Sequence, residues 1–370
     1  MTLQSDHLYI QAALELAARG RHSCAPNPPV GCIIARDGQV LGRGYHRVAG
    51  EGHAEVNAIA DAGSDVARAT VYVSLEPCAF VGRTPACAQT LIDAGVGRVV
   101  VGVQDPHPQV AGKGSQMLRD AGIDVEILDL PEAHDMIAGF KSRIVRKRPR
   151  VVLKSASSLD GAVALSSGES QWITGAPARA EVQRLRALSD AVITGVGTVI
   201  ADNPQLTVRD EALLQGNLKQ PLRVVLDHNL RAPTDRQIFS ERTLVVHGSG
   251  ADAVYSSPTR GEVEYLALPD GTRNLTVILE ALAARGCNNV LVEAGPKVLG
   301  SFLNANQDTP LWDEWICFVA PKVLGSGSLS LAEFTITELA SSETAVIVDH
   351  KIVGDDLQLR LHPVIKTNER

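Results

Sequence analysis

A histidine, a glutamate and two cysteines near the start of the chain have the types and spacing of a zinc site. His53 and Glu55 are two residues apart, Cys78 follows a proline, and eight residues separate Cys78 from Cys87. Zinc prefers imidazole and thiolate ligands, and three protein ligands leave a fourth position for water, as in catalytic sites. The spare carboxylate of Glu55 would exchange a proton with that water. These residues therefore predict a hydrolytic zinc centre on His53, Cys78 and Cys87.

This order of residues is typical of zinc deaminases, which carry His-x-Glu followed by Pro-Cys and a second cysteine. In the general pattern two residues separate the cysteines, so the longer spacing here requires a loop that folds back. The other cysteines and three histidines lack such a context, and we expect them to be structural or surface residues: Cys24, Cys32, Cys287, Cys317, His22, His46 and His107.

Helices and strands alternate around these residues, which indicates a layered α/β domain. A first helix is expected over 6–19, capped by Ser5 or Asp6, and Asp37-Gly38 marks a hairpin after a strand at 30–35. The remaining elements expected in this half are helices at 53–62, 86–94 and 115–121 and strands at 70–75, 98–103 and 123–128.

Six basic residues between 141 and 150 are interpreted as a solvated linker at a domain edge. We therefore expect two domains, 1–146 and 147–370, the second again alternating strand and helix. Its clearer elements are helices at 177–188 and 275–285, the latter capped by Asn274, and strands at 151–155, 191–194, 223–227, 243–247 and 290–293.

Composition limits the classes of function. The 370 residues carry a net charge of −7, which argues against nucleic acid as the main partner. No stretch is apolar enough to span a membrane, and the first 19 residues lack a secretion signal, so a cytoplasmic protein is expected. Six cysteines in so long a chain do not suggest a disulfide framework.

The second half contains no Gly-x-Gly-x-x-Gly, which disfavours a standard dinucleotide-binding unit. A strand that ends at Glu293 is followed by Ala-Gly-Pro-Lys and a helix. The start of this helix could hold a cofactor phosphate, with Gly295 allowing a close approach to the backbone. Pro296 is equally what ordinary helix capping would select, so both interpretations stay open.

The chain resembles the bifunctional riboflavin-biosynthesis deaminase/reductases over nearly its whole length. In the first half the resemblance rests on the segments PNPPVGC (26–32), GHAE (52–55), LEPC (75–78), GRTPAC (82–87) and QDPHPQVAGKG (104–114). It includes the long cysteine spacing and implies a cytidine-deaminase-like domain with zinc on His53, Cys78 and Cys87 and Glu55 as proton shuttle. The implied reaction is deamination of a diaminopyrimidinone ribosylamine 5′-phosphate, with Asn27 contacting the substrate.

In the second half the resemblance rests on KSASSLDG (154–161), GESQWIT (168–174), GVGT (195–198), DNPQLTVR (202–209), VEAGP (292–296) and PKVLG (321–325). It implies a dihydrofolate-reductase-like domain that uses NADPH to reduce the ribosyl group to ribityl. The residues implied to bind NADPH are Ala156, Trp172, Thr198, Asp202, Gly295, Pro296, Lys297, Val298, Leu299, Gly300 and Ser301. Those implied to face the substrate are Ser170, Arg186, Leu206, Arg209 and Glu293.

Lys154 and Asp202 are the expected proton-handling residues of this reduction. The plainer interpretations are that Lys154 is a charge at a strand end and Asp202 a turn residue. One departure from the family lies in the zinc loop, where Ala79, Phe80 and Val81 replace a polar segment. Arg83 and Lys113 are candidates for binding the substrate phosphate.

Two other functions remain to be weighed. One is a single-activity nucleobase or tRNA deaminase with a non-catalytic C-terminal domain, and the other is a zinc-stabilised binding module. Glu55 argues against the second, because a structural zinc needs no spare carboxylate. For the lead interpretation, the partners expected are a small phosphorylated pyrimidine and further copies of the chain in a homo-oligomer.

Overall fold

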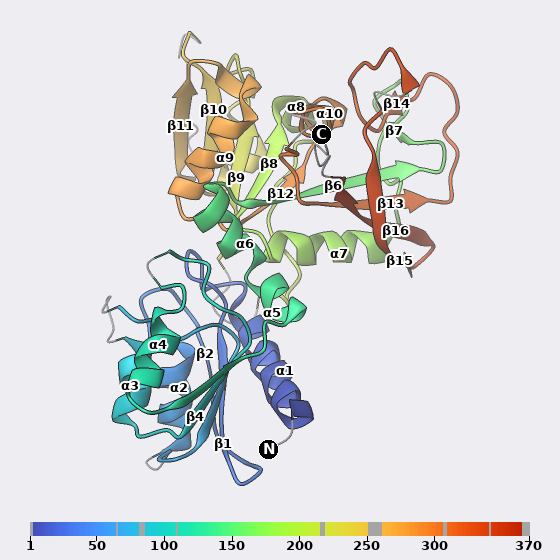
Figure 1. The fold of residues 1–370 in the computed structure, drawn as a ribbon. Coiled ribbons are helices and arrows are strands. Elements are labelled where there is room, and N and C mark those ends of the chain that lie inside the picture. The colour runs from blue at the N-terminus through green and yellow to red at the C-terminus, as the bar shows by residue number, and fades with distance from the viewer. Residues whose placement is uncertain are drawn as a thin grey trace. The chain divides into compact units, whose positions relative to one another are not determined.

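The structure, a computed structural model, describes residues 3–63, 66–80, 86–108, 110–214, 219–250, 261–305, 309–339 and 342–364. Contacts divide the chain into two compact units, of which the first contains Met1–Lys147 and the second contains Arg148–Gln215 and Gln220–Arg370. Each unit has its own sheet (Figure 1). In the described part of the chain, no helix has the length and apolarity needed to cross a membrane.

The first unit is built on a five-stranded sheet in the order β2-β1-β3-β4-β5. Strand β1 is antiparallel to β2 and β3, whereas β3, β4 and β5 are mutually parallel. The elements are α1 (Leu3–Gly20), β1 (Gly31–Arg36), β2 (Gln39–Tyr45), α2 (Ala54–Ala62), β3 (Thr70–Val73), α3 (Cys87–Asp93), β4 (Arg98–Val101), α4 (Lys113–Asp120), β5 (Asp124–Ile127), α5 (Pro131–Met136), α6 (Ala138–Lys141) and the π-helix η1 (Ser142–Arg146).

Helices cover both faces of this sheet. Successive side chains of a strand point to opposite faces, so both faces carry apolar side chains that must be buried. Ile34 and Val71 point to the face that packs against α2, α3 and α4. Their neighbours Ile33 and Tyr72 point to the opposite face, which α1 and α5 cover (Figure 1). The result is a three-layer α/β/α unit, and the hairpin at Asp37-Gly38 is confirmed.

The expected cap of the first helix is wrong. Helix α1 begins at Leu3, and Asp6 lies inside it, 1% exposed. Its carboxylate accepts hydrogen bonds from the Tyr72 hydroxyl and from the Arg98 guanidinium, all at 3.0 Å. Burial opposes the charge, but these bonds from Arg98 and Tyr72 hold the pKa of Asp6 below its usual value. Asp6 thus ties the helix to the sheet instead of starting it.

The second unit contains a nine-stranded sheet in the order β11-β10-β9-β8-β12-β6-β13-β16-β15, parallel up to β13 and antiparallel in the last two pairs. The elements are β6 (Arg150–Ser158), β7 (Ala162–Ala164), α7 (Ala176–Ala187), β8 (Ala191–Gly195), α8 (Val196–Asp202), β9 (Leu222–Leu226), η2 (Gln237–Ser240), β10 (Thr243–Gly248), β11 (Val263–Leu268), η3 (Gly271–Arg273), α9 (Leu275–Ala284), β12 (Asn289–Glu293), α10 (Pro296–Leu303), β13 (Glu314–Ala320), β14 (Leu329–Ser330), β15 (Ala345–Val353) and β16 (Asp356–Pro363).

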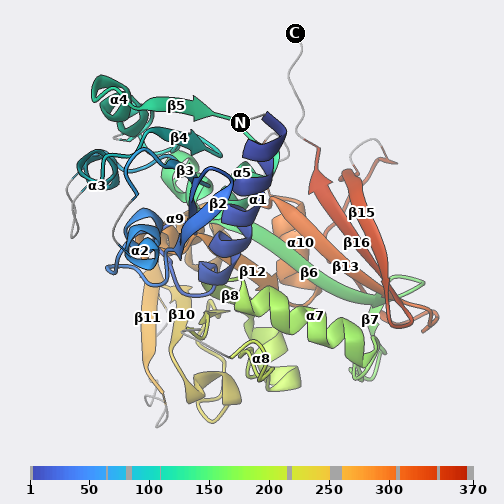
Figure 2. The ribbon, with the colours of Figure 1, turned by 90° about the horizontal axis from the view of Figure 1, so that it is seen from below.

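Two apolar layers sandwich this sheet. Helices α9 and α10 cover one face, where Leu153 and Val292 are buried, and α7 and α8 cover the other, where Val152 and Leu291 are buried (Figure 2). The helices and strands expected from the sequence are present, with ends displaced by at most three residues. Asn274 caps α9 as expected, its side chain accepting the Val277 N–H.

The basic stretch is only in part the solvated domain edge that its composition suggested, because Lys141, Arg146 and Lys147 are exposed whereas Arg148 is buried. It forms the end of α6, the helix η1 and the start of β6. Arg148 is 7% exposed, and its guanidinium donates to the Asp313 carboxylate at 2.8 Å and to the Pro310 carbonyl at 3.1 Å. Arg150 forms an ion pair with Glu314. Acidic partners about 160 residues away explain the burial of these charges.

Candidate active sites

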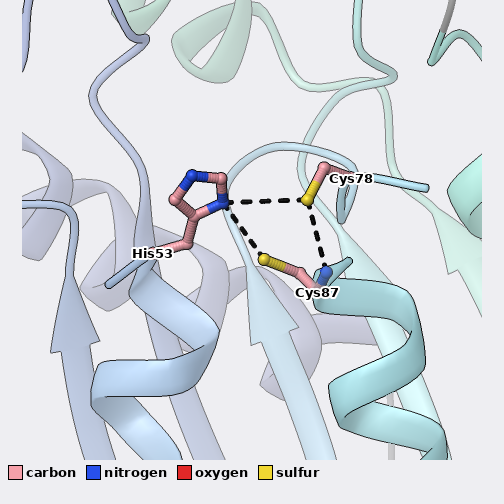
Figure 3. A group of neighbouring side chains, drawn as sticks. All are labelled: His53, Cys78 and Cys87. Carbon is pink, nitrogen blue, oxygen red and sulfur yellow. Dashed lines mark hydrogen bonds between the residues drawn. The ribbon is translucent and has the colours of Figure 1, made fainter. Parts of the chain in front are cut away.

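Three short elements of the first unit bring the predicted zinc ligands together. His53 occupies the N-cap position of α2, Cys87 is the first residue of α3, and Cys78 lies in the loop that follows β3 (Figure 3). The Nδ1 atom of His53 is 3.1 Å from Cys87 Sγ and 3.7 Å from Cys78 Sγ, and all three ligand atoms lie within 4.8 Å of one another. Ligand atoms around a tetrahedral zinc are separated by roughly 3.5–3.8 Å, so this donor set fits zinc.

Two glycines let the helices approach closely enough to form this cluster. A Cβ on Gly44 of β2 would lie 2.2 Å from the carbonyl oxygen of Ala54, at the start of α2. A Cβ on Gly114 of α4 would lie 1.8 Å from the Pro77 carbonyl oxygen, next to Cys78. Any side chain at these positions would push a ligand-bearing segment away from the cluster.

The electrostatics of the cluster favour a thiolate beside a carboxyl group whose pKa is raised. Hydrogen bonds from Cys87 and His53 outweigh burial and lower the pKa of Cys78 to about 4. Glu55 is 3% exposed in the first turn of α2, and burial raises its pKa. A carboxyl group that is easily protonated and lies one turn from the ligands is suited to carry a proton at this site.

His46 is a neighbour of the cluster that the sequence did not indicate. It is 2% exposed, its Nε2 is 3.0 Å from Asn27 Nδ2, and its ring meets that of His53 edge-on at 5.2 Å between centroids. The expected substrate residue Asn27 is therefore connected through His46 to a zinc ligand. No local motif marks His46, because it reaches the site only through the pairing of β2 with β1.

In the second unit, ionisable residues gather at the carboxyl ends of neighbouring strands. Glu293 on β12 is paired in register with Lys154 on β6, and Lys154 Nζ is 3.9 Å from Glu293 Oε1. Arg186 of α7 donates two hydrogen bonds of 2.8 Å to the same carboxylate and a third, of 3.0 Å, to the Thr207 carbonyl. Burial opposes the charge of Glu293, but the fields of Arg186 and Lys154 lower its pKa.

Other expected reductase residues contact neighbouring segments of the second unit. The Gly295 N–H donates to Thr198 Oγ1 at 3.2 Å, which ties the start of α10 to α8 and leaves an open backbone turn. Partial desolvation raises the pKa of Asp202, against the effect of a hydrogen bond from Ser170. Trp172 is 62% exposed, with the Arg179 guanidinium 4.3 Å from its ring centroid. A phosphate-bearing cofactor fits this turn, where a Cβ would reach 3.4 Å from Thr198 Oγ1.

Some expected residues are placed differently. The side chain of Leu206 is 3% exposed and packs in the core, so it does not face solvent or a ligand. Leu299 and Gly300 are buried on the inner side of α10, whereas Lys297 is exposed. Lys113 is exposed at the start of α4. Val81 and Arg83 lie outside the described residues.

Comparison with known proteins identifies the family of both halves of the chain. Residues 3–103 match the family model for the cytidine and deoxycytidylate deaminase zinc-binding region, and residues 149–347 match that for the RibD C-terminal domain. The riboflavin biosynthesis protein RibD of Escherichia coli K12 is 42% identical over 368 residues, covering 96% of this chain and 99% of that protein. The chain belongs to the RibD family.

Solved structures of the family superpose on nearly the whole chain. RibD of Acinetobacter baumannii is 40% identical with a TM-score of 0.87, covering 98% of this chain and 99% of that one. The diaminohydroxyphosphoribosylaminopyrimidine deaminase/5-amino-6-(5-phosphoribosylamino)uracil reductase of Thermotoga maritima is 32% identical with a TM-score of 0.86, covering 98% and 99%. The expected pair of folds, cytidine-deaminase-like and dihydrofolate-reductase-like, is thereby confirmed.

Membership of the RibD family establishes the activity. The chain is a bifunctional deaminase and reductase of riboflavin biosynthesis that uses zinc and NADPH and acts on a small pyrimidine. A single-activity deaminase with an inert C-terminal domain is not favoured, because residues 149–347 match the RibD C-terminal domain.

Proposed function

We propose that the two reactions are divided between the two halves of the chain, deamination in 1–146 and reduction in 147–370. The observation that carries this proposal is the separation of the two groups of chemical residues. The described metal-ligand cluster, His53, Cys78 and Cys87, lies wholly in the first unit. The ion cluster of Lys154, Arg186 and Glu293 lies wholly in the second.

For the first reaction, we assign zinc binding to His53, Cys78 and Cys87. Zinc supplies Lewis acidity that lowers the pKa of water. Glu55 Oε would accept a proton from the attacking water as the water oxygen bonds to the amino-bearing ring carbon. It would deliver that proton to the amino nitrogen, which leaves as ammonia when its bond to the same carbon breaks. The Asn27 side chain, held by His46, hydrogen-bonds the pyrimidine and orients it.

For the second reaction, we assign NADPH to the open turn between α8 and α10. The residues assigned to its binding are Ala156, Trp172, Thr198, Asp202 and residues 295–301. NADPH supplies the hydride that reduces C1′ of the ribosyl group. Lys154 Nζ, oriented by Glu293, donates a proton to the ring oxygen of the ribosyl group as that ring opens. Asp202, which is hydrogen-bonded to Ser170, returns a proton to Lys154.

Arg186, Arg209 and Ser170 have a different role in this proposal, which is to hold the substrate. A guanidinium binds phosphate through two parallel hydrogen bonds. Arg209 lies close enough to lower the pKa of Glu293, and its Nη1 is 3.4 Å from Gln205 Oε1. Its exposed guanidinium is the better placed of the two arginines for the phosphate, because Arg186 is occupied by Glu293.

Substitution Glu55→Gln tests the assignment and the division of labour together. The variant should keep about one zinc per chain and release ammonia about 100- to 10,000-fold more slowly. Reduction of the separately supplied deaminated intermediate by NADPH should be unchanged. Glu132→Gln, at an exposed carboxylate in the first turn of α5, is the matched control.

Either of two results contradicts this proposal. Ammonia release at the wild-type rate by the zinc-loaded Glu55→Gln variant would exclude Glu55 as the proton carrier. A parallel loss of reductase activity would exclude independent sites in the two halves.

We further propose that the enzyme is a cytoplasmic homo-oligomer that does not bind nucleic acid. The net charge of −7 disfavours binding to a phosphate backbone. Strand β15 is the last strand of its sheet and exposes Val346, Ile347, Val348 and Ile352. An apolar sheet edge favours pairing with another chain. Light scattering that gives the 39.3 kDa mass of one chain would contradict the oligomer.

A further inference from the structure

The segment 24–29, between α1 and β1, carries Asn27, the residue assigned above to orient the pyrimidine. Three of its six residues are prolines, which have no N–H to donate. The Asn27 N–H donates to the Cys24 carbonyl at 2.9 Å, and the Cys24 thiol donates to the Asn27 carbonyl at 3.4 Å. A segment with so few N–H groups depends on contacts from elsewhere in the fold to fix its conformation.

One such contact comes from the basic stretch at the end of the first unit. Arg143 of η1 lies 117 residues after Pro26, and its Nη2 donates to the Pro26 carbonyl oxygen at 2.8 Å. This carbonyl and the Asn27 N–H belong to the same planar peptide group. Arg143 therefore holds one end of that plane and the Cys24 carbonyl holds the other. The plane sets the direction in which the Asn27 side chain leaves the backbone.

The guanidinium of Arg143 is itself oriented by an aromatic ring. Its Cζ lies 5.6 Å from the centroid of the Phe140 ring, within the range of a cation–π contact. Phe140 belongs to α6 and is only 8% exposed, so the ring is a fixed support. A guanidinium held in this way loses less freedom when it donates to the Pro26 carbonyl.

The side chain of Asn27 is held from the other direction. Its Nδ2 is 3.0 Å from Nε2 of His46, a residue that is 2% exposed and whose ring meets that of His53. The backbone of Asn27 is thus fixed through Arg143 and its amide group through His46. Two fixed points on one residue orient it more strictly than either contact alone.

We propose that Arg143 is a positioning residue of the deaminase, which aims Asn27 at the pyrimidine through the Pro26–Asn27 peptide group. This inference rests on the substrate role of Asn27 proposed above. Arg143 lies on η1, whereas the zinc ligands and Glu55 lie on or beside α2, α3 and β3. Loss of Arg143 should therefore weaken substrate binding and leave the zinc centre and the chemical step intact.

Steady-state release of ammonia by the full zinc-loaded chain tests this inference. Arg143→Met should raise KM for the diaminopyrimidinone ribosylamine phosphate about 5-fold, the usual effect of one lost hydrogen bond, with kcat and zinc content unchanged. Arg143→Lys should recover most of this loss, since an ammonium group also donates to a carbonyl.

Arg146→Met is the matched control, because it removes the same charge from the same helix. The Arg146 Nη2 donates to Ser142 Oγ at 2.8 Å, within η1 itself. This variant should keep the KM of the wild type. An equal rise of KM in Arg146→Met would assign the effect to long-range attraction of the substrate phosphate and overturn the role of Arg143.

A double-variant cycle with Asn27→Ala shows whether Arg143 acts through Asn27. Asn27→Ala should raise KM, and adding Arg143→Met should raise it no further, because the residue that Arg143 positions is already lost. A wild-type KM in Arg143→Met, or effects that add in the double variant, would overturn the inference. An unchanged KM in Asn27→Ala would instead overturn the substrate role of Asn27, on which the inference rests.

Discussion

The ion pair between Arg186 and Glu293 allows a sharp test of the second unit. Their side chains are 9% and 16% exposed, and the two hydrogen bonds between them each measure 2.8 Å. Substitution Arg186→Met preserves much of the side-chain volume but leaves the Glu293 carboxylate in a poorly solvated site. Lys154 Nζ, at 3.9 Å, and the field of Arg209 remain to compensate its charge.

Removing one partner of a buried ion pair costs about 3–5 kcal/mol of unfolding free energy. The remaining lysine should keep the loss near the lower limit, about 3 kcal/mol. For a unit of this size, each kcal/mol shifts the melting temperature by about 2–4 °C, so a decrease of about 6–12 °C is expected. Arg184→Met is the matched control on the same helix, since its side chain is 66% exposed and a surface pair is worth at most about 1 kcal/mol.

The sign of the pH dependence should also change. In the wild type the lowered pKa of Glu293 stabilises the fold above the ordinary glutamate value, and this contribution is lost as pH falls through the lowered pKa. In Arg186→Met, burial acts on Glu293 with less opposition, so its pKa should rise above the unfolded value. The difference in unfolding free energy between the wild type and this variant should then shrink as the pH falls from 7 toward 5.

Intrinsic fluorescence is the appropriate assay, because all three tryptophans, Trp172, Trp312 and Trp315, lie in the second unit. Urea unfolding followed by this signal reports that unit alone. A loss below about 1 kcal/mol, or one equal to that of Arg184→Met, would refute the argument. If the loss of unfolding free energy grew as the pH falls, Glu293 would not be the group that carries the uncompensated negative charge in Arg186→Met.

Two further predictions concern the first unit. Burial raises the pKa of Asp105 to about 6, so ionisation of this carboxyl group destabilises the fold as the pH rises through that value. Asp105→Asn should therefore raise the free energy of unfolding by at most about 3 kcal/mol at pH 7.5 and by little at pH 4. Calorimetric unfolding at several pH values measures this, and a difference independent of pH would contradict it. Cys78→Ala should bind zinc at least about 100-fold more weakly, whereas Cys287→Ala, a buried thiol outside the cluster, should keep about one zinc per chain by metal analysis. Full zinc occupancy in Cys78→Ala would exclude Cys78 as a ligand.

Much of the architecture follows from local patterns. Apolar alternation and capping residues locate the helices and strands, as with Asn274 at the start of α9. The same reasoning failed at Asp6, because a capping residue and a buried ion-pair partner have the same sequence signature. Arg98, its partner, lies 92 residues away and is adjacent only once the sheet has formed.

The sequence by itself determined the donor types of the zinc site and the presence of two chemical halves, since side-chain identity decides what an atom can ligate or protonate. Tertiary structure decided which distant groups meet. His46 reaches Asn27 through strand pairing, and Glu293 meets Arg186 across 107 residues. Burial and charge compensation arise from packing between elements, and no local pattern of residues encodes the distances on which they depend.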